Sequence, residues 1–233
     1  MTSAPAPALA ASGLSKSYGS SPALAGVDFR VDPGDSVAIM GASGSGKTTL
    51  LHCLAGIVAP DAGTVVLTTA SGSVDVTRLG EAGRSRLRRE EFGFVFQQGL
   101  LLPELTAVEN VALPLMLTGA DRRAAEQTAA MWLAALGLAG FESRRIGELS
   151  GGQAQRVAIA RAQTTGASVV FADEPTGALD SATSAEVMDA LIRSTTGRGR
   201  SLVVVTHDET VAARCSRVVR LADGRIVDEV ASR

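Results

Sequence analysis

Hydrophobic residues form short continuous runs in several parts of this chain. Residues 35–40, 168–172 and 201–206 (DSVAIM, SVVFA and SLVVVT) are such runs, and the last two are without polar alternation. Continuous runs of this length favour strands that are covered on both faces, as in a parallel sheet. Residues 182–197 lie between the last two runs and have helical periodicity, which predicts a strand–helix–strand crossover. We therefore expect an α/β core.

Shorter β patterns occur near both ends of the chain. Residues 9–31 and 63–79 contain short β segments with turn residues, and residues 217–230 predict a hairpin around Asp223 and Gly224. These segments predict antiparallel structure in addition to the α/β core.

The middle of the chain is helical in pattern. Residues 121–136 predict a helix with Asp121 as its N-cap and Gly137 just beyond its end. Because the region from about 99 to 160 has no strong strand pattern, we expect a helical insertion between two portions of the core.

Composition limits the class of protein. The 233 residues are 45% hydrophobic and 20% charged, with a formal net charge of −2, which argues against a dedicated nucleic-acid binder. No stretch approaches the roughly 18–20 apolar residues that a membrane span needs. Residues 1–8 lack the features of a signal peptide and predict a disordered lead-in to one domain over 9–233. Cys53 and Cys215 form neither a metal spacing nor a disulfide framework, which fits a reducing cytoplasm, and Cys53 is expected to be a small buried apolar residue.

The sequence GASGSGKT at 41–48 matches the P-loop pattern and lies between a predicted strand and a predicted helix. Small residues let successive backbone N–H groups point at phosphate oxygens, and the helix N-terminus adds positive potential. Lys47 would lie near the β- and γ-phosphates, Thr48 would offer its hydroxyl to Mg²⁺, and Thr49 would donate a further hydrogen bond. The pattern predicts binding of ATP or GTP. The predicted cradle comprises Gly41, Ala42, Ser43, Gly44, Ser45, Gly46, Lys47, Thr48 and Thr49.

Two carboxylates follow the apolar run at 168–172. Asp173 and Glu174 at a buried strand's end need a cationic or proton-donating partner, and Mg²⁺ bound to Thr48 would supply one. Asp173 would then act close to the metal, and Glu174 would orient or deprotonate the attacking water. In the alternative interpretation, the acidic pair caps the following helix.

Further motifs follow in a fixed order: GFVFQ at 93–97, LSGGQ at 149–153, ADEPTGALD at 172–180 and VVTHD at 204–208. With the P-loop, they make the chain resemble the ATP-binding cassette ATPases from about residue 10 to residue 230. The resemblance implies a RecA-like P-loop NTPase core with an antiparallel β subdomain and an inserted α-helical subdomain. The core would cover about 9–98 and 161–233, and the helical subdomain about 99–160.

The resemblance also assigns roles to residues outside the P-loop. Tyr18 matches the aromatic position that stacks on adenine, although it could be an ordinary half-buried strand residue. Gln97 matches a glutamine that reaches the metal and the attacking water. His207 matches a histidine that contacts the γ-phosphate and positions Glu174.

A second copy of the chain is implied by the LSGGQ segment. Ser150, Gly151, Gly152 and Gln153 match the signature loop, which contacts the γ-phosphate held by the opposite protomer. Taken alone, this segment could be a helix cap with Ser150 as N-cap. Asp180 matches a residue at the dimer interface. The resemblance thus implies ATP, Mg²⁺ and a homodimer with ATP between the protomers.

Within the family, residues 93–119 and the DEPTGALD segment look similar to the lipoprotein-releasing and macrolide-efflux ATPases, which pair with FtsX-type permeases. This implies an ATPase at the cytoplasmic face of the membrane that drives export or extraction of a lipophilic or peptide-like substrate. Three positions depart from the family pattern. Gln98–Gly99 replaces a polar–aromatic pair, Ile146 stands where proline is common, and Gln163 stands where leucine is common.

Two other functions stay open at this point. A regulatory cassette of the cell-division type would change the shape of a membrane partner without moving a substrate. A cassette of translation or DNA repair fits less well, because the chain has one uninterrupted cassette and no basic stripe. The charge run at 84–91 (RSRLRREE) favours a solvated helix face over a permease or lipid contact.

Overall fold

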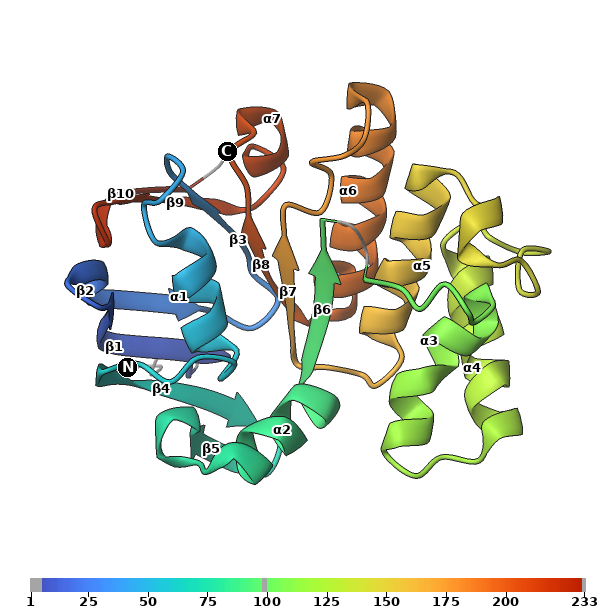
Figure 1. The fold of residues 1–233 in the computed structure, drawn as a ribbon, viewed down its shortest axis with the longest axis horizontal. Coiled ribbons are helices and arrows are strands. Elements are labelled where there is room, and N and C mark those ends of the chain that lie inside the picture. Colours follow the sequence, from blue (N-terminus) through green and yellow to red (C-terminus); the bar gives the residue numbers. More distant parts are fainter. Residues whose placement is uncertain (1–5, 98–99, 232–233) are drawn as a thin grey trace, which may run out of the picture.

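The computed structural model describes residues 6–97 and 100–231, which form two sheets with helices around them (Figure 1). A four-stranded sheet has the order β2-β1-β4-β5, and a six-stranded sheet has the order β10-β9-β3-β8-β7-β6. The strands are β1 (Leu9–Tyr18), β2 (Ser21–Val31), β3 (Ser36–Met40), β4 (Ala62–Thr69), β5 (Gly72–Asp75), β6 (Phe92–Phe96), β7 (Val169–Asp173), β8 (Ser201–Val205), β9 (Arg217–Ala222) and β10 (Arg225–Ala231). The helices are α1 (Lys47–Leu54), α2 (Glu81–Glu90), α3 (Ala107–Leu117), α4 (Arg122–Ala135), α5 (Gly151–Gln163), α6 (Ser181–Thr195) and α7 (Glu209–Ala212), with short 3₁₀ turns η1 (Val76–Arg78), η2 (Ile146–Glu148) and η3 (Thr196–Arg198).

The six-stranded sheet confirms the parallel core that the apolar runs predict. Strands β9, β3, β8, β7 and β6 are parallel to their neighbours, and only β10 runs antiparallel, beside β9. All five residues of β3 and of β8 are buried, because helices or the second sheet cover both faces. Helix α6 connects β7 to β8, as the crossover predicts.

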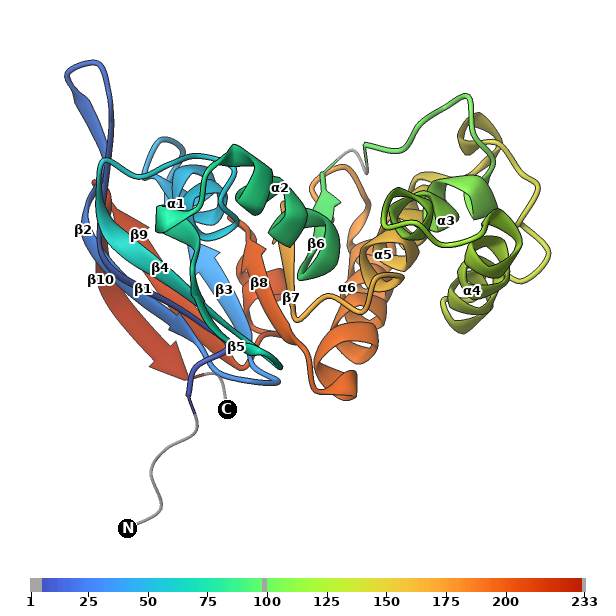
Figure 2. The ribbon, with the colours of Figure 1, turned by 90° about the horizontal axis from the view of Figure 1, so that it is seen from below.

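Side-chain alternation along the strands divides the interior into two clusters. Val37 and Ile39 of β3 point to one face, where they pack with α1 and the inner face of the four-stranded sheet. Ala38 and Met40 point to the other face, where α5, α6 and α7 cover the sheet and α3 and α4 pack against α5. Figures 1 and 2 both show the four-stranded sheet at one end of the molecule and α3 and α4 at the opposite end.

Local signals predict several element ends correctly. Asp121 caps α4 by accepting a hydrogen bond from the backbone N–H of Arg123 at 3.3 Å. The β9–β10 hairpin turns at Asp223 and Gly224, which have φ values of 47° and 69°. Residues 1–5 of the predicted lead-in lie outside the described residues. Ala8 is buried, and its carbonyl accepts a hydrogen bond from the Thr68 N–H at 2.9 Å.

The charge run at 84–91 lies mostly on α2 and is only partly solvated. Arg84 and Arg88 pair with Glu81 and keep 19% and 24% of their side-chain surface exposed. Arg88 also donates to the carbonyl of Gly56 at 2.7 Å. Arg86 and Arg89 are exposed.

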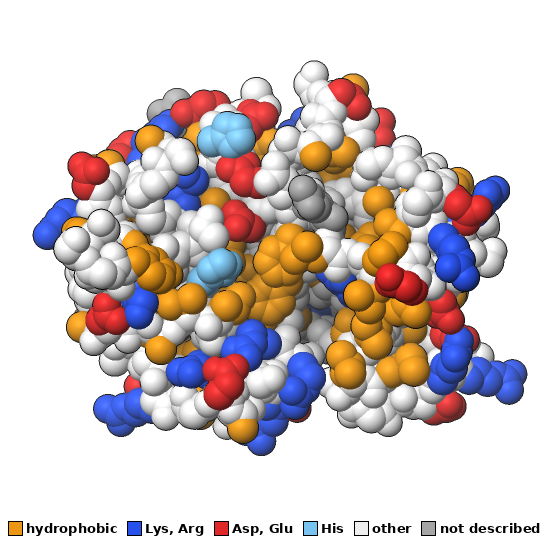
Figure 3. All heavy atoms as spheres, in the orientation of Figure 1, with side chains coloured by type: hydrophobic (Ala, Val, Ile, Leu, Met, Phe, Trp, Pro, Cys, Tyr) orange, Lys and Arg blue, Asp and Glu red, His pale blue; other side chains and the backbone are white. Residues whose placement is uncertain are grey.

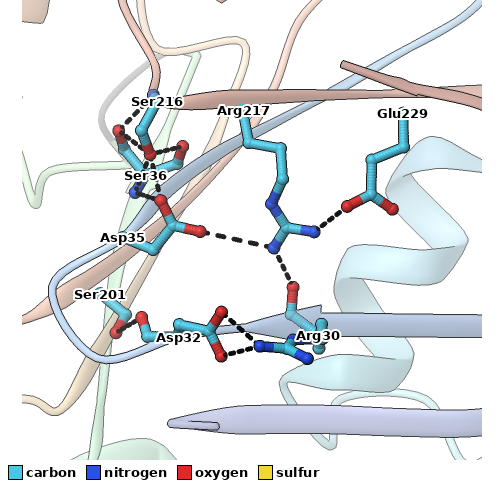
Figure 4. Close-up of polar contacts among 8 residues, drawn as sticks. All are labelled: Arg30, Asp32, Asp35, Ser36, Ser201, Ser216, Arg217 and Glu229. Atoms are coloured by element: carbon cyan, nitrogen blue, oxygen red, sulfur yellow. Dashed lines mark hydrogen bonds and ion pairs between the residues drawn. The ribbon is translucent and has the colours of Figure 1, made fainter. Parts of the chain in front are cut away.

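A polar cluster at the start of β3 joins the two sheets (Figure 4). Arg217 of β9 donates to the carbonyl of Arg30 in β2 at 2.5 Å and pairs with Asp35 at 3.4 Å and with Glu229 of β10. Ser201 Oγ of β8 donates to the carbonyl of Asp32 at 3.0 Å. These contacts connect β2, β3, β8, β9 and β10 at the end of the six-stranded sheet where β3 begins.

Candidate active site

The P-loop connects β3 to α1, and two of its glycines are required by close backbone approaches. Gly41 has a φ of 152°, and a Cβ atom there would lie 2.2 Å from the carbonyl oxygen of Leu221. Gly46 has a φ of 103°, and its Cβ would lie 2.2 Å from the carbonyl oxygen of Ala23. A larger residue at either position would push the loop away from β9 or β2. These contacts hold the loop in the tight shape that phosphate binding requires.

Two polar groups of the loop fit a bound anion. The Lys47 ammonium donates to the carbonyl oxygens of Gly41 at 2.8 Å and Ala42 at 2.9 Å, so the side chain folds back over the loop. The Ser45 hydroxyl oxygen is buried and has no hydrogen-bond partner within residues 6–97 and 100–231. Ser43, Gly44 and Ser45 line a small cavity of about 160 Å³ beside the turn between β9 and β10.

A cleft beside the P-loop brings together the three residues predicted to hold Mg²⁺. Thr48, Gln97 and Asp173 line a cavity of about 320 Å³ together with Glu174. Burial raises the pKa of the Asp173 carboxyl, while the charge of His52 and the nearby Thr48 hydroxyl oppose that rise. Hydroxyl, amide and carboxylate oxygens are the donor set that Mg²⁺ prefers, so the residues fit the predicted metal.

Glu174 is held by the end of β8. Its Oε1 atom lies 2.8 Å from Nδ1 of His207, and its Oε2 atom accepts a hydrogen bond from the Thr206 hydroxyl at 3.3 Å. The residue has a φ of 45°, a conformation that non-glycine residues adopt rarely and that is common at functional sites. The hydrogen bond and the charge of Glu174 raise the pKa of His207 above its usual 6.5. Neither Asp173 nor Glu174 caps the next helix, because Asp180 does so.

Gln97 reaches this cleft from the end of β6. A Cβ atom on Gly177 would lie 2.8 Å from Nε2 of Gln97, so the glutamine lies directly against the segment that follows Glu174. The departure at Gln98–Gly99 lies outside the described residues. Ile146 begins η2 and is partly buried against the helical cluster.

The signature residues form the cap of α5. Ser150 Oγ accepts a hydrogen bond from the Gln153 N–H at 3.3 Å, and Gln153 Oε1 accepts one from the Ser150 N–H at 2.9 Å. A Cβ atom on Gly152 would lie 2.5 Å from Cγ2 of Thr183, and one on Gly151 would lie 3.1 Å from Cδ2 of Leu179. Both glycines therefore let α5 approach the start of α6 closely.

Asp180 lies at the same junction of α5 and α6. Its carboxylate accepts hydrogen bonds from the Thr183 N–H at 2.9 Å and the Thr183 hydroxyl at 2.7 Å, which lowers the pKa of Asp180. Neither Asp180 nor any residue of 150–153 lines the two cavities beside the P-loop. A single chain therefore keeps its predicted signature loop apart from its own P-loop.

Tyr18 also lies apart from these cavities. It ends β1 with 54% of its surface exposed, and Nζ of Lys16 lies 5.9 Å from the centre of its ring. This exposure fits both adenine stacking and an ordinary half-buried strand residue. Adenine stacking by Tyr18 stays a prediction.

Sequence reasoning missed one residue of the site and underrated another. Thr206 is buried and donates to Glu174, and its position at the end of an apolar strand was an available signal. His52, expected to be purely structural, lies near enough to Asp173 that its charge would lower the pKa of that carboxyl.

Comparison with known proteins identifies the family. The family model described as ABC transporter matches residues 24–177. The chain belongs to the ABC transporter family. A LolD protein, the lipoprotein-releasing system ATP-binding protein of Geobacter metallireducens, is 46% identical over 218 residues, which are 92% of this chain and 95% of that protein. The macrolide export ATP-binding/permease protein MacB of Burkholderia thailandensis is 44% identical over 203 residues, which are 87% of this chain but only 30% of MacB.

Solved structures confirm the predicted cassette fold. The dimeric ATP-binding cassette MJ0796, bound to ADP and Pi in a post-hydrolysis state, superposes with a TM-score of 0.86 at 36% identity and covers 97% of this chain and 99% of its own. The chain is thus an ATP-binding and ATP-hydrolysing subunit of an ABC transporter. None of the helices in the described part of the chain is both long and apolar enough to cross a membrane.

Proposed function

We propose that this chain drives a membrane permease through ATP-dependent dimerisation, with one ATP between the P-loop of each protomer and the signature loop of the other. The observation that carries the proposal is the cleft in which Thr48, Gln97, Asp173 and Glu174 meet beside the P-loop. The signature residues of the same chain lie outside that cleft, so a second copy would be needed to close it. The dimeric state of MJ0796 with ADP and Pi supports this arrangement.

Hydrolysis would depend on Glu174 and the residues that hold it. When bound, Mg²⁺ would neutralise charge on the ATP phosphates, and Thr48, Gln97 and Asp173 are the residues that would hold it. The Glu174 carboxylate would orient the attacking water and accept its proton. His207 and Thr206 fix both carboxylate oxygens of Glu174, at 2.8 Å and 3.3 Å, so the base is oriented before substrate binds.

The signature loop would bring the start of α5 to the ATP that is bound by the P-loop of the other protomer. The first N–H groups of a helix have no partner within the helix, and they favour an anion such as the γ-phosphate of ATP. Ser150 and Gln153 already satisfy two of the local donors, which fixes the direction of α5. Asp180 and the start of α6 contact this segment through Gly152 and Thr183, so both would reach the dimer interface together.

The test separates ATP binding from ATP hydrolysis. Glu174→Gln should reduce the hydrolysis rate by about 10²–10⁴-fold while it leaves ATP affinity unchanged. Lys47→Ala should weaken ATP binding itself. Glu126→Gln is the matched control and should leave both quantities unchanged, because Glu126 lies on α4 and pairs with the exposed Arg122. Normal turnover in Glu174→Gln would refute the assignment of the base.

The permease would dock on an apolar groove between β6 and α3. The groove has a volume of about 300 Å³, and Leu117 on its rim is 62% exposed. Figure 3 shows hydrophobic side chains gathered on this face, next to basic side chains. A docked segment there would lie on β6, which ends one residue before Gln97, so its movement would reach the cleft directly. The lining residues include Arg88, Phe92, Phe94, Phe96, Leu113, Pro114 and Leu117.

The likeness to LolD and MacB supports an FtsX-type permease and a lipophilic or peptide-like substrate that is exported or extracted. The chain would then act at the cytoplasmic face of the membrane, held there by the permease. Co-purification with the candidate permease tests this partner. Leu117→Asp should abolish co-purification, whereas Val227→Asp should not, because Val227 is equally exposed at 63% but lies on β10. Equal retention of the permease by both variants would contradict docking on the groove.

A further inference from the structure

A cavity of about 540 Å³ opens between α4, α5 and α6, and the proposed function uses none of its lining residues. Its volume lies within the range of small-molecule sites, about 300–1,000 Å³. The apolar part of its wall comes from Trp132 and Leu136 at the end of α4 and from Ala190 on α6. Trp132 is the only tryptophan in the sequence.

The two acidic residues of the cavity wall are already neutralised. Glu186 of α6 pairs with Arg156 of α5 at 2.5 Å. Asp189, one turn further along α6, pairs with Arg214. Each of the two carboxylates thus has its own arginine partner.

Three further arginines at this site have no carboxylate partner in the described part of the chain. Arg193 and Arg198 line the cavity, and Arg200 lies beside them. Among the described residues, the Arg200 guanidinium donates to two neutral oxygens of Gln163, at 2.9 Å and 3.2 Å. Burial, followed by the charge of Arg198, lowers the pKa of Arg200.

The guanidinium group of Arg198 is oriented by the indole ring of Trp132. Its central carbon lies 4.3 Å from the ring centre, and that of Arg200 lies 5.8 Å from the same ring. Contact with a ring face leaves the N–H donors at the edge of a guanidinium free to bind an oxyanion. Arg198 therefore presents several donors beside Trp132, with Arg193 in the same cavity.

We propose that this cavity is a second anion site, separate from the nucleotide cradle, that binds a small phosphate-bearing molecule through Arg193 and Arg198. Phosphate groups suit the site because they carry up to two negative charges and accept hydrogen bonds from more than one guanidinium at once. The C-terminal dipole of α6 favours a basic residue such as Arg193 by itself, but it does not account for the cation stacked on Trp132.

Inorganic pyrophosphate is the probe, in buffer without divalent cations, at constant ionic strength and with ADP present to fill the P-loop. Because all tryptophan fluorescence comes from Trp132, a saturable change in emission reports binding beside it. We expect a dissociation constant below about 1 mM. Equilibrium dialysis with labelled pyrophosphate measures the same binding in variants in which the fluorescence itself is altered.

Arg193→Ala and Arg198→Ala should each weaken pyrophosphate binding by about tenfold or more, with the thermal unfolding midpoint checked to confirm folding. Arg123→Ala is the matched control, an exposed arginine on α4 outside the cavity. Lys47→Ala should retain the binding, since the P-loop is not involved. A signal that does not saturate, or an affinity unchanged in Arg193→Ala and Arg198→Ala, would overturn the proposal. Loss of binding in Lys47→Ala would also overturn it, because the probe would then occupy the nucleotide cradle.

Discussion

Replacement of Gln163 by leucine tests how much the hydrogen bonds of its buried side-chain amide contribute to the stability of this protein. Gln163 ends α5 and is fully buried. Its amide nitrogen donates to Thr195 Oγ1 at 2.7 Å and to Ser194 Oγ at 3.3 Å, and its amide oxygen accepts from Arg200 at 2.9 Å. Leucine would keep the approximate volume but none of these bonds.

The loss of stability in Gln163→Leu depends on which hydrogen-bond partners of Gln163 are left unsatisfied. Thr195 is fully buried, so its oxygen would lose its donor without access to water. Arg200 would still donate to the backbone carbonyl of Gln163, at 3.2 Å. One buried polar group left unsatisfied costs about 1–3 kcal/mol, and we expect Gln163→Leu to lower the free energy of unfolding by that amount. Gln127→Leu, an exposed glutamine on α4, should change it by less than about 0.5 kcal/mol.

Urea unfolding followed by circular dichroism measures these differences. The decisive variant combines Gln163→Leu with Thr195→Val, which removes both ends of the Gln163–Thr195 hydrogen bond and keeps the approximate volume of both side chains. Replacing both partners by apolar groups of the same shape can be nearly neutral, so the double variant should be more stable than Gln163→Leu alone. The explanation, that Gln163→Leu leaves a buried polar group unsatisfied, would be refuted by either of two results. One is a strictly additive loss of unfolding free energy in the double variant, and the other is no loss in Gln163→Leu.

Three further predictions concern thiols, a titrating histidine and the P-loop. Burial raises the pKa of Cys53 to about 11 and that of Cys215 to about 12, so a disulfide reagent at pH 8 should modify neither until urea unfolds the chain; fast reaction of the native protein would contradict this. Glu174 raises the pKa of His207 above 6.5, so its stabilising interaction is complete below pH 6.5 and is lost as the pH rises through the folded value. An NMR titration should show that pKa falling towards 6.5 in Glu174→Gln, and an unchanged value would exclude the pair. Gly46→Ala, which places a Cβ 2.2 Å from a backbone oxygen at a φ of 103°, should destabilise the protein by about 1–3 kcal/mol and abolish binding of a fluorescent ATP analogue.

Much of the fold was predictable because its signals are local. The apolar runs at 35–40, 168–172 and 201–206 became β3, β7 and β8, since burial on both faces requires such a composition. Asp223 and Gly224 predicted the hairpin turn, because these residue types tolerate the positive φ values that the turn requires. The order of the strands is different. β3 lies between β8 and β9, which are more than 150 residues later in the chain, and no local pattern predicted these neighbours.

The site was predictable where a motif has a fixed spacing and less so where partners come from afar. Thr48 and Asp173 are 125 positions apart, and the chemistry of Mg²⁺ was enough to pair them. The partners of Gln163 in α6 and the stacking of Arg198 on Trp132 carry no such local pattern. These contacts depend on how α4, α5 and α6 pack, which side-chain periodicity alone does not specify.

The molecular mass of Glu174→Gln in solution tests the central claim most directly. In this variant ATP should stay bound and unhydrolysed, so the closed state should accumulate. Light scattering after size exclusion should give twice the chain mass of 23.8 kDa with ATP and Mg²⁺, and the single-chain mass with ADP. A mass of 23.8 kDa at saturating ATP would contradict a site that is shared between two copies of the chain.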